Sequence, residues 1–158
     1  MTLCLVPECQ HLNDRDALQC QACGHPLLIH NQFRPLSKIG EGGFGRTFKA
    51  IDEGKPSRPA CVIKQLYFIN EALRRESIAF FEQEAVHLEK LGHESQIPTL
   101  IWNGQENDRY YIVQEYIDGQ NLKQELLDSG AFHEEKIWQI LGGAVVLAVN
   151  RLKACSTI

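Results

Sequence analysis

The sequence lacks a surplus of positive charge, because 16 Lys and Arg stand against 20 Asp and Glu, for a formal net charge of −4 over 158 residues. Binding to nucleic acid or to an anionic membrane depends on positive charge, so neither is expected as a partner. The sequence also lacks an apolar run near the roughly 20 residues that cross a bilayer, a secretory leader with its cleavage site, internal repeats and low-complexity tracts. We therefore expect a cytoplasmic globular protein.

Cysteine is scarce in most of the chain but dense at its start, since the first 23 positions hold four of the six cysteines. Cys4 and Cys9 are separated by four residues, and Cys20 and Cys23 by two. Two short loops of this kind can direct four sulfurs at one ion, which is the arrangement of a tetrahedral zinc site. Two disulfides are the alternative, and a reducing cytoplasm disfavours them.

Residues 1–30 are accordingly predicted to form a zinc ribbon, whose closed four-thiolate shell would make the zinc structural and leave no open position for catalysis. Gly24 follows the second cysteine pair and can supply the positive φ of a tight knuckle. His11 and His25 are interpreted as surface residues, because four cysteines complete the shell. So short a segment buries little apolar surface, and we expect metal binding to supply most of its folding free energy. Its acidic side chains outnumber its basic ones, which favours a protein partner or a spacer role.

A pattern of short strands and one helix begins after residue 32. The expected strands are 33–39, 47–51, 61–68, 99–102 and 110–114, with a turn through 103–108; the expected helices are 73–91, a short one after 121, and the start of a long one at 134–141. Apolar residues at spacings of three and four, from Ile78 to Leu88, give the first helix one apolar face, and Gly92 ends it. Cys61 is interpreted as a buried small side chain and Cys155 as an incidental thiol. This layout indicates the α+β class.

Three glycines form the pattern Gly-x-Gly-x-x-Gly between the first two of these strands, at Gly40, Gly42 and Gly45. A dinucleotide-binding fold would need a helix directly after the glycines. Here a strand follows, which favours a flexible hairpin that covers phosphate groups with backbone N–H groups. An ordinary glycine-rich hairpin is the alternative, and it predicts nothing specific further along the chain.

A lysine and a glutamate follow at informative positions. Lys64 ends the run Val-Ile-Lys in the third strand, and Glu84 lies on the apolar face of the predicted helix, three residues after Phe81. A carboxylate on an apolar face is costly unless a positive charge pairs with it. Lys64 is the natural partner of Glu84.

The fifth strand ends in the sequence Val-Gln-Glu-Tyr-Ile-Asp-Gly at residues 113–119. The glycine loop, strand lysine, helix glutamate and this segment follow one another in the order and spacing of a protein kinase. From residue 33 to about 141, the chain resembles a eukaryotic-like bacterial serine/threonine protein kinase that carries an N-terminal zinc ribbon. The resemblance implies an N-lobe at 33–117, made of a five-stranded antiparallel sheet and one long helix, followed at 118–158 by the start of the helical C-lobe.

The same resemblance implies ATP as the bound nucleotide and gives roles to individual residues. The three glycines would hold the nucleotide phosphates. Lys64 would bind the α- and β-phosphates and be oriented by Glu84. Gln114 would be the gatekeeper, and the backbone groups of Glu115 and Ile117 would contact the adenine edge.

Kinase chemistry also needs a catalytic-loop aspartate and a magnesium-binding Asp-Phe-Gly. Neither His-Arg-Asp nor Asp-Phe-Gly occurs in the 158 residues, so no catalytic residue is assigned. The apolar pattern decays after Gly142, and we expect a truncated kinase whose reading frame is lost near that residue. Such a chain would bind ATP weakly or not at all and transfer no phosphate alone. The alternative is a non-catalytic zinc-ribbon and N-lobe interaction module, or the remnant of a disrupted kinase gene, whose bare apolar surface favours association with a protein partner.

Overall fold

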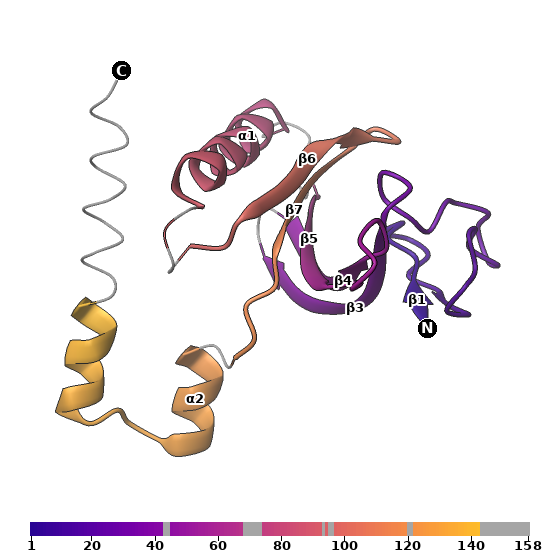
Figure 1. Cartoon of the computed structure of the whole chain (residues 1–158). Coiled ribbons are helices and arrows are strands. Elements are labelled where there is room, and N and C mark those ends of the chain that lie inside the picture. The colour runs from indigo at the N-terminus through magenta and orange to yellow at the C-terminus, as the bar shows by residue number, and fades with distance from the viewer. Residues whose placement is uncertain (43–44, 68–73, 93, 95–96, 120–121, 143–158) are drawn as a thin grey trace.

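The computed structural model describes residues 1–42, 45–67, 74–92, 94, 97–119 and 122–142 (Figure 1). Its elements are β1 (Thr2–Leu3), β2 (Leu12–Asn13), β3 (Phe33–Gly42), β4 (Gly45–Asp52), β5 (Ala60–Leu66), α1 (Arg74–Leu91), β6 (Leu100–Glu106), β7 (Arg109–Glu115) and α2 (Leu122–Ser129). A further helical segment occupies 134–142. The expectations for residues 143–158, Cys155 included, lie outside the described residues. None of the described helices has the length and apolar character that crossing a bilayer requires.

Five strands form one sheet in the order β3-β4-β5-β7-β6, and every neighbouring pair is antiparallel. The predicted five-stranded antiparallel sheet with one long helix is therefore confirmed. The predicted turn through 103–108 is wrong at its start, because β6 continues to Glu106. Only Asn107 and Asp108 turn, with φ of 49° and 59°, the backbone that a two-residue hairpin requires.

The helix α1 packs on one face of this sheet. Strand alternation places Leu66 and Ile112 on that face, where they form a buried cluster with Phe81 and Ala85 of α1. The helix ends as the sequence predicts, since the N–H of Gly92 donates to the carbonyl of Leu88 at 2.7 Å. One apolar face of α1 thus fixes the helix against β5 and β7.

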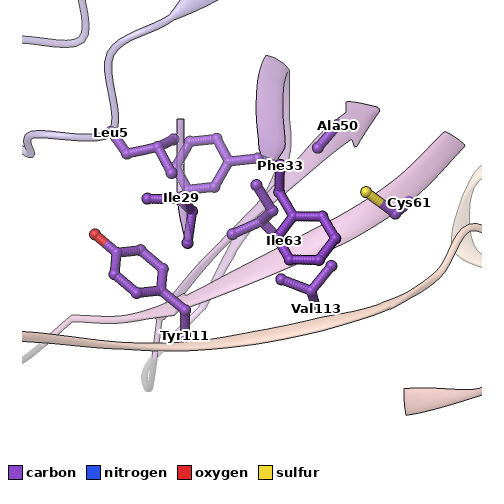
Figure 2. Close-up of a cluster of buried hydrophobic side chains, with 9 residues drawn as sticks. Leu5, Ile29, Phe33, Ala50, Cys61, Ile63, Tyr111 and Val113 are labelled. Atoms are coloured by element: carbon purple, nitrogen blue, oxygen red, sulfur yellow. The ribbon is translucent and has the colours of Figure 1, made fainter. Parts of the chain in front are cut away.

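The opposite face of the sheet carries a second buried cluster, to which β3, β4, β5 and β7 all contribute (Figure 2). The cluster also contains Leu5 and Ile29, which come from the N-terminal segment and are 7% and 5% exposed. Figure 1 shows this segment on the side of the sheet away from α1. Cys61 lies in the same cluster and is fully buried, as the sequence suggests.

Residues 1–30 therefore share an apolar core with the sheet. Their own cluster is small and consists of Cys4, Cys20 and Leu27 with a few half-buried neighbours. We expected the metal to supply most of the folding free energy of this segment, but the burial of Leu5 and Ile29 against the sheet adds a contribution that the sequence did not reveal.

Polar contacts join the same two parts. Arg34 of β3, 3% exposed, donates to the carbonyl of Ala17 at 2.7 Å and pairs with Glu53 through two N–H groups, at 2.9 and 3.1 Å. The backbone N–H of His30 donates to the carboxylate of Glu106 at 2.7 Å. These contacts fix the N-terminal segment to both edge strands of the sheet.

After β7 the chain leaves the sheet in an extended segment and enters α2 and the helical segment 134–142 (Figure 1). These two helices are joined by an ion pair between Lys136 and Glu125 at 2.9 Å. They leave six large apolar side chains exposed by 43–70%: Leu122, Leu126, Leu127, Ile137, Trp138 and Leu141. The start of a helical region and its bare apolar surface agree with the expectation from the sequence.

Candidate functional site

The predicted partners Lys64 and Glu84 meet in the structure. Lys64 lies on β5 on the face that α1 covers, and its Nζ forms an ion pair with Oε1 of Glu84 on α1. The two side chains remain 30% and 41% exposed, so the pair borders open space rather than the core. The positive charge of Lys64 is therefore both oriented and accessible to an anion.

The glycine loop is the hairpin between β3 and β4. Gly40 lies opposite Thr47, and Gly42 lies opposite Gly45. A Cβ at Gly45 would stand 2.4 Å from the backbone carbonyl oxygen of Gln65, so only glycine fits there. A Cβ at Gly40 or Gly42 would meet no such obstacle within the described residues. Packing within the chain therefore requires a glycine at position 45 only, among the three. Residues 43 and 44 of the loop lie outside the described residues.

A cavity of about 350 Å³ lies between this hairpin, β5 and α1. Four predicted site residues border it: Gly42, Gly45, Lys64 and Glu84. The sequence reading missed its other lining residues: Glu41, Arg46, Thr47, Gln65 and Phe81. Strand alternation could have found Thr47, which the register places directly across from Lys64. The structure thus places residues of the glycine hairpin and one lysine around a single cavity.

The predicted adenine-contacting segment lies at the end of β7 and outside the lining of that cavity. Gln114 is 8% exposed and lies opposite Val62 of β5, on the same sheet face as Lys64. The backbone N–H of Glu115 donates to the carbonyl of Thr99 at 2.9 Å. Ile117 follows the strand and is 59% exposed. Glu115 and Ile117 thus lie where β7 leaves the sheet.

The four N-terminal cysteines come together in the structure. Their sulfur atoms all lie within 4.8 Å of one another, with Cys4 and Cys23 at 3.6 Å and Cys9 and Cys20 at 3.6 Å. Four sulfurs bound tetrahedrally to zinc at about 2.3 Å stand about 3.8 Å apart, whereas a disulfide requires about 2.05 Å. The four are free thiols here. The donor set therefore fits a tetrahedral metal ion.

Burial and hydrogen bonding act in opposite directions on these thiols, and a thiolate is favoured at Cys20. Burial raises the pKa of Cys4. Burial acts in the same direction on Cys20, but the backbone N–H groups of Cys23 and Ala22 outweigh it and lower the pKa of Cys20 to about 6. Gly24 has the positive φ, 72°, that its place after the second pair predicts. These N–H donors can stabilise the negative sulfur that a metal ion binds.

The first cysteine pair uses the same backbone geometry without a glycine. Gln10 directly follows Cys9 and has a φ of 45°. Its side chain donates to the carbonyl of Pro7 at 2.8 Å. The histidines lie apart from the four sulfurs: His11 is exposed, as predicted, whereas His25 is half-buried and contacts Arg109 at 3.4 Å.

The five-stranded sheet, the helix packed on it, the glycine hairpin and the lysine–glutamate pair together define the N-terminal lobe of a protein kinase. The chain belongs to the protein tyrosine and serine/threonine kinase family, whose model matches residues 33–153. This match extends past residue 142, where we expected the pattern of the family to end.

Several curated relatives are serine/threonine kinases of cyanobacteria. The chain is 38% identical to serine/threonine-protein kinase B of Synechocystis over 89% of its own length and 25% of that protein. It is 32% identical to kinase F of the same organism, over 88% of this chain and 33% of the relative. It is 39% identical to serine/threonine-protein kinase PknA of Nostoc, over 72% of this chain and 21% of the relative. The chain thus spans a third or less of the length of each of these relatives.

Solved structures show the same fold. Rad53 residues 1–466 in complex with AMP-PNP matches with a TM-score of 0.61 at 20% identity, over 80% of this chain and 32% of that one. The apo form of PpkA-294 matches with a TM-score of 0.55 at 22% identity, over 65% and 42%.

Proposed function

We propose that this chain is the nucleotide-binding portion of an ATP-dependent serine/threonine protein kinase. The observation that carries the proposal is the ion pair between Lys64 and Glu84 at the border of the cavity below the glycine hairpin. Phosphate groups are bound by backbone N–H groups of glycine hairpins and by an oriented lysine, and this cavity is bordered by a glycine hairpin and by Lys64. The cyanobacterial relatives, which are serine/threonine kinases, support serine and threonine as the acceptors.

The roles proposed for the individual residues follow the resemblance to protein kinases. Gly40, Gly42 and Gly45 let the hairpin approach the phosphates, and Lys64, held by Glu84, binds the α- and β-phosphates. Gln114 limits the depth of the adenine site. The backbone groups of Glu115 and Ile117 bind the adenine edge.

We propose further that these 158 residues transfer no phosphate alone. They contain neither His-Arg-Asp nor Asp-Phe-Gly, which supply the catalytic base and a magnesium ligand in the family. The second candidate, a non-catalytic interaction module left by truncation or disruption of a kinase gene, is supported by the exposed apolar side chains of α2 and 134–142. Nucleotide binding separates the two candidates, since the second does not require it.

The test is ATP binding to the full 158-residue chain, measured by displacement of a fluorescent ATP analogue. One charged hydrogen bond contributes about 1.5–3 kcal/mol, so Lys64→Met is expected to weaken binding roughly 10- to 100-fold. Lys90→Met, on the exposed side of α1, is the matched control and leaves the affinity unchanged. Absence of binding at millimolar ATP, or equal affinity of Lys64→Met and the parent chain, would refute the proposal.

We also propose that Cys4, Cys9, Cys20 and Cys23 hold one structural zinc ion. With this site we propose the domain boundaries expected from the sequence, which are a zinc ribbon at 1–30 and a kinase-like domain at 33–158. We also propose a reducing, cytoplasmic location, which keeps the thiols free. Atomic emission of protein purified under reducing conditions is expected to show one zinc per chain. A Cys20→Ser variant that kept a full equivalent of zinc would contradict the four-cysteine site.

A further inference from the structure

One buried hydrogen bond joins the cysteine cluster to the strand that carries Lys64. The side-chain amide of Gln65 donates through Nε2 to the backbone carbonyl of Leu5 at 3.0 Å. Leu5 directly follows Cys4, and Gln65 directly follows Lys64. The contact spans 60 positions of sequence, and Gln65 is 1% exposed. A single contact therefore connects the neighbour of a sulfur ligand with the neighbour of the phosphate-binding lysine.

Gln65 stands near the end of β5, where the pairing with β7 stops while the pairing with β4 continues. The ladder between β5 and β7 ends at the pair Gln65 and Tyr111, and β5 itself ends one residue later at Leu66. The glycine hairpin also rests there, because the carbonyl of Gln65 lies against Gly45. Movement of this end of β5 would change the positions of Lys64 and of the glycine hairpin together.

Gln65 is a costly residue if it serves only to fill the core. Its Nε2 also contacts Tyr111 Oη at 3.3 Å, but its Oε1 is buried and has no hydrogen-bond partner among the described residues. A buried unpaired amide oxygen destabilises a protein, whereas leucine would fill a similar volume without a polar atom. Gln65→Leu would remove this unpaired oxygen but would also leave the Leu5 carbonyl without its donor, so its two effects on stability oppose each other.

We propose that Gln65 is a positioning residue that couples the metal-binding segment to the nucleotide site, by fixing the end of β5 that carries Lys64 to the backbone of Leu5. The inference rests on the proposed zinc and ATP sites. If both ligands favour the same position of β5, each must raise the affinity of the other by the same factor, because binding linkage is reciprocal.

The interface offers a matched control at a distance from Lys64. Thr2 is fully buried, and its hydroxyl donates to the carbonyl of Pro35 on β3 at 2.9 Å. Thr2→Val and Gln65→Leu each replace a polar side chain by an apolar one of similar size. Each removes one buried side-chain donor to a main-chain carbonyl across the same interface. Only Gln65 is adjacent to the phosphate-binding lysine.

The experiment uses the full 158-residue chain with Zn²⁺ and MgATP as probes. Zinc affinity is measured by competition with a chromophoric chelator, with and without saturating MgATP in excess magnesium. The parent chain is expected to bind zinc about fivefold or more tightly with MgATP, and to bind MgATP more tightly with zinc by the same factor. In Gln65→Leu the factor should fall to near one, whereas in Thr2→Val it should persist. If circular dichroism shows that Gln65→Leu does not fold, the same measurement is made on Gln65→Met.

Each other result counts against the proposal. A factor of one in the parent chain, an unchanged factor in the Gln65 variants, or equal loss in Thr2→Val would overturn the positioning role. If the parent chain binds no MgATP, the proposed nucleotide site itself fails. Binding of MgATP without coupling refutes only the inference about Gln65.

Discussion

The burial of Leu5 makes a quantitative prediction about residues 1–30. Leu5 lies in the buried cluster on the face of the sheet opposite α1, here called the outer cluster, and is 7% exposed (Figure 2). Leu5→Ala removes three carbon groups at about 0.8 kcal/mol each, or about 2.4 kcal/mol, before any cavity is counted. Buried leucines replaced by alanine lose about 2.7–5 kcal/mol when the cavity is included. We therefore expect Leu5→Ala to lower the free energy of unfolding of the whole lobe by about 3 kcal/mol.

The assay follows the lobe rather than the N-terminal segment. Trp102 of β6 packs against the outer cluster, whereas Trp138 is 65% exposed. In a Trp138→Phe background, the fluorescence of Trp102 in urea reports the unfolding of the sheet. A loss of about 3 kcal/mol corresponds to a fall in Tm of about 6–12 °C for a chain of this size.

The control is a leucine of the same segment that the sheet does not bury. Leu18 is 66% exposed, and Leu18→Ala should change the free energy of unfolding by less than about 0.5 kcal/mol. If Leu5→Ala left the Trp102 transition unchanged, residues 1–30 would be an independent unit and the shared core would be refuted.

Two further predictions concern the glycine hairpin and the acid limb of stability. Gly45→Ala should lower the free energy of unfolding by about 1–3 kcal/mol and weaken ATP binding, because the added Cβ would press on the carbonyl of Gln65. Gly42→Ala, where a Cβ meets no such obstacle, should leave the urea midpoint unchanged. Equal effects of the two substitutions would argue against the steric reason. The hydrogen bonds from Arg34 lower the pKa of Glu53 below its ordinary value of 4.5. The stability that these hydrogen bonds contribute is therefore complete above pH 4.5 and is lost as the pH falls through the folded-state pKa of Glu53. We expect Glu53→Gln to make the decline of Tm between about pH 5 and 3 less steep than in the parent chain. An unchanged slope would show that the pKa of Glu53 is the same in the folded and unfolded states.

The location of residues 1–30 changes the role expected for them. Docking to a protein partner or separating two domains were the roles expected from their composition. In the structure, the segment instead packs on the outer face of the sheet through Leu5, Ile29 and the contacts of Arg34 and His30. An interaction surface of residues 1–30 must therefore lie on the side that faces away from the sheet.

Local and periodic features could be predicted from the sequence. The strands and α1 follow from apolar spacing, and Gly92 ends α1 as expected because the helix needs a residue that allows close approach to the Leu88 carbonyl. The pairing of Lys64 with Glu84 was also predictable, since a carboxylate on an apolar helix face requires a positive partner. The end of β6 was not, because Gly104 is a turn signal by composition yet lies inside the strand beneath Trp102.

Spacing along the sequence was enough to predict the kind of lobe, the pairing of Lys64 with Glu84 beside its cavity, and the four cysteines that come together. Each of these depends on spacing along the chain, which sets period, turn and ligand geometry. Only the tertiary structure decided that Leu5 and Ile29 cover the sheet and that Gln65 reaches Leu5 across 60 positions. An apolar residue or a buried amide has no local signature of its partner, because its energy depends on which surface the fold brings against it.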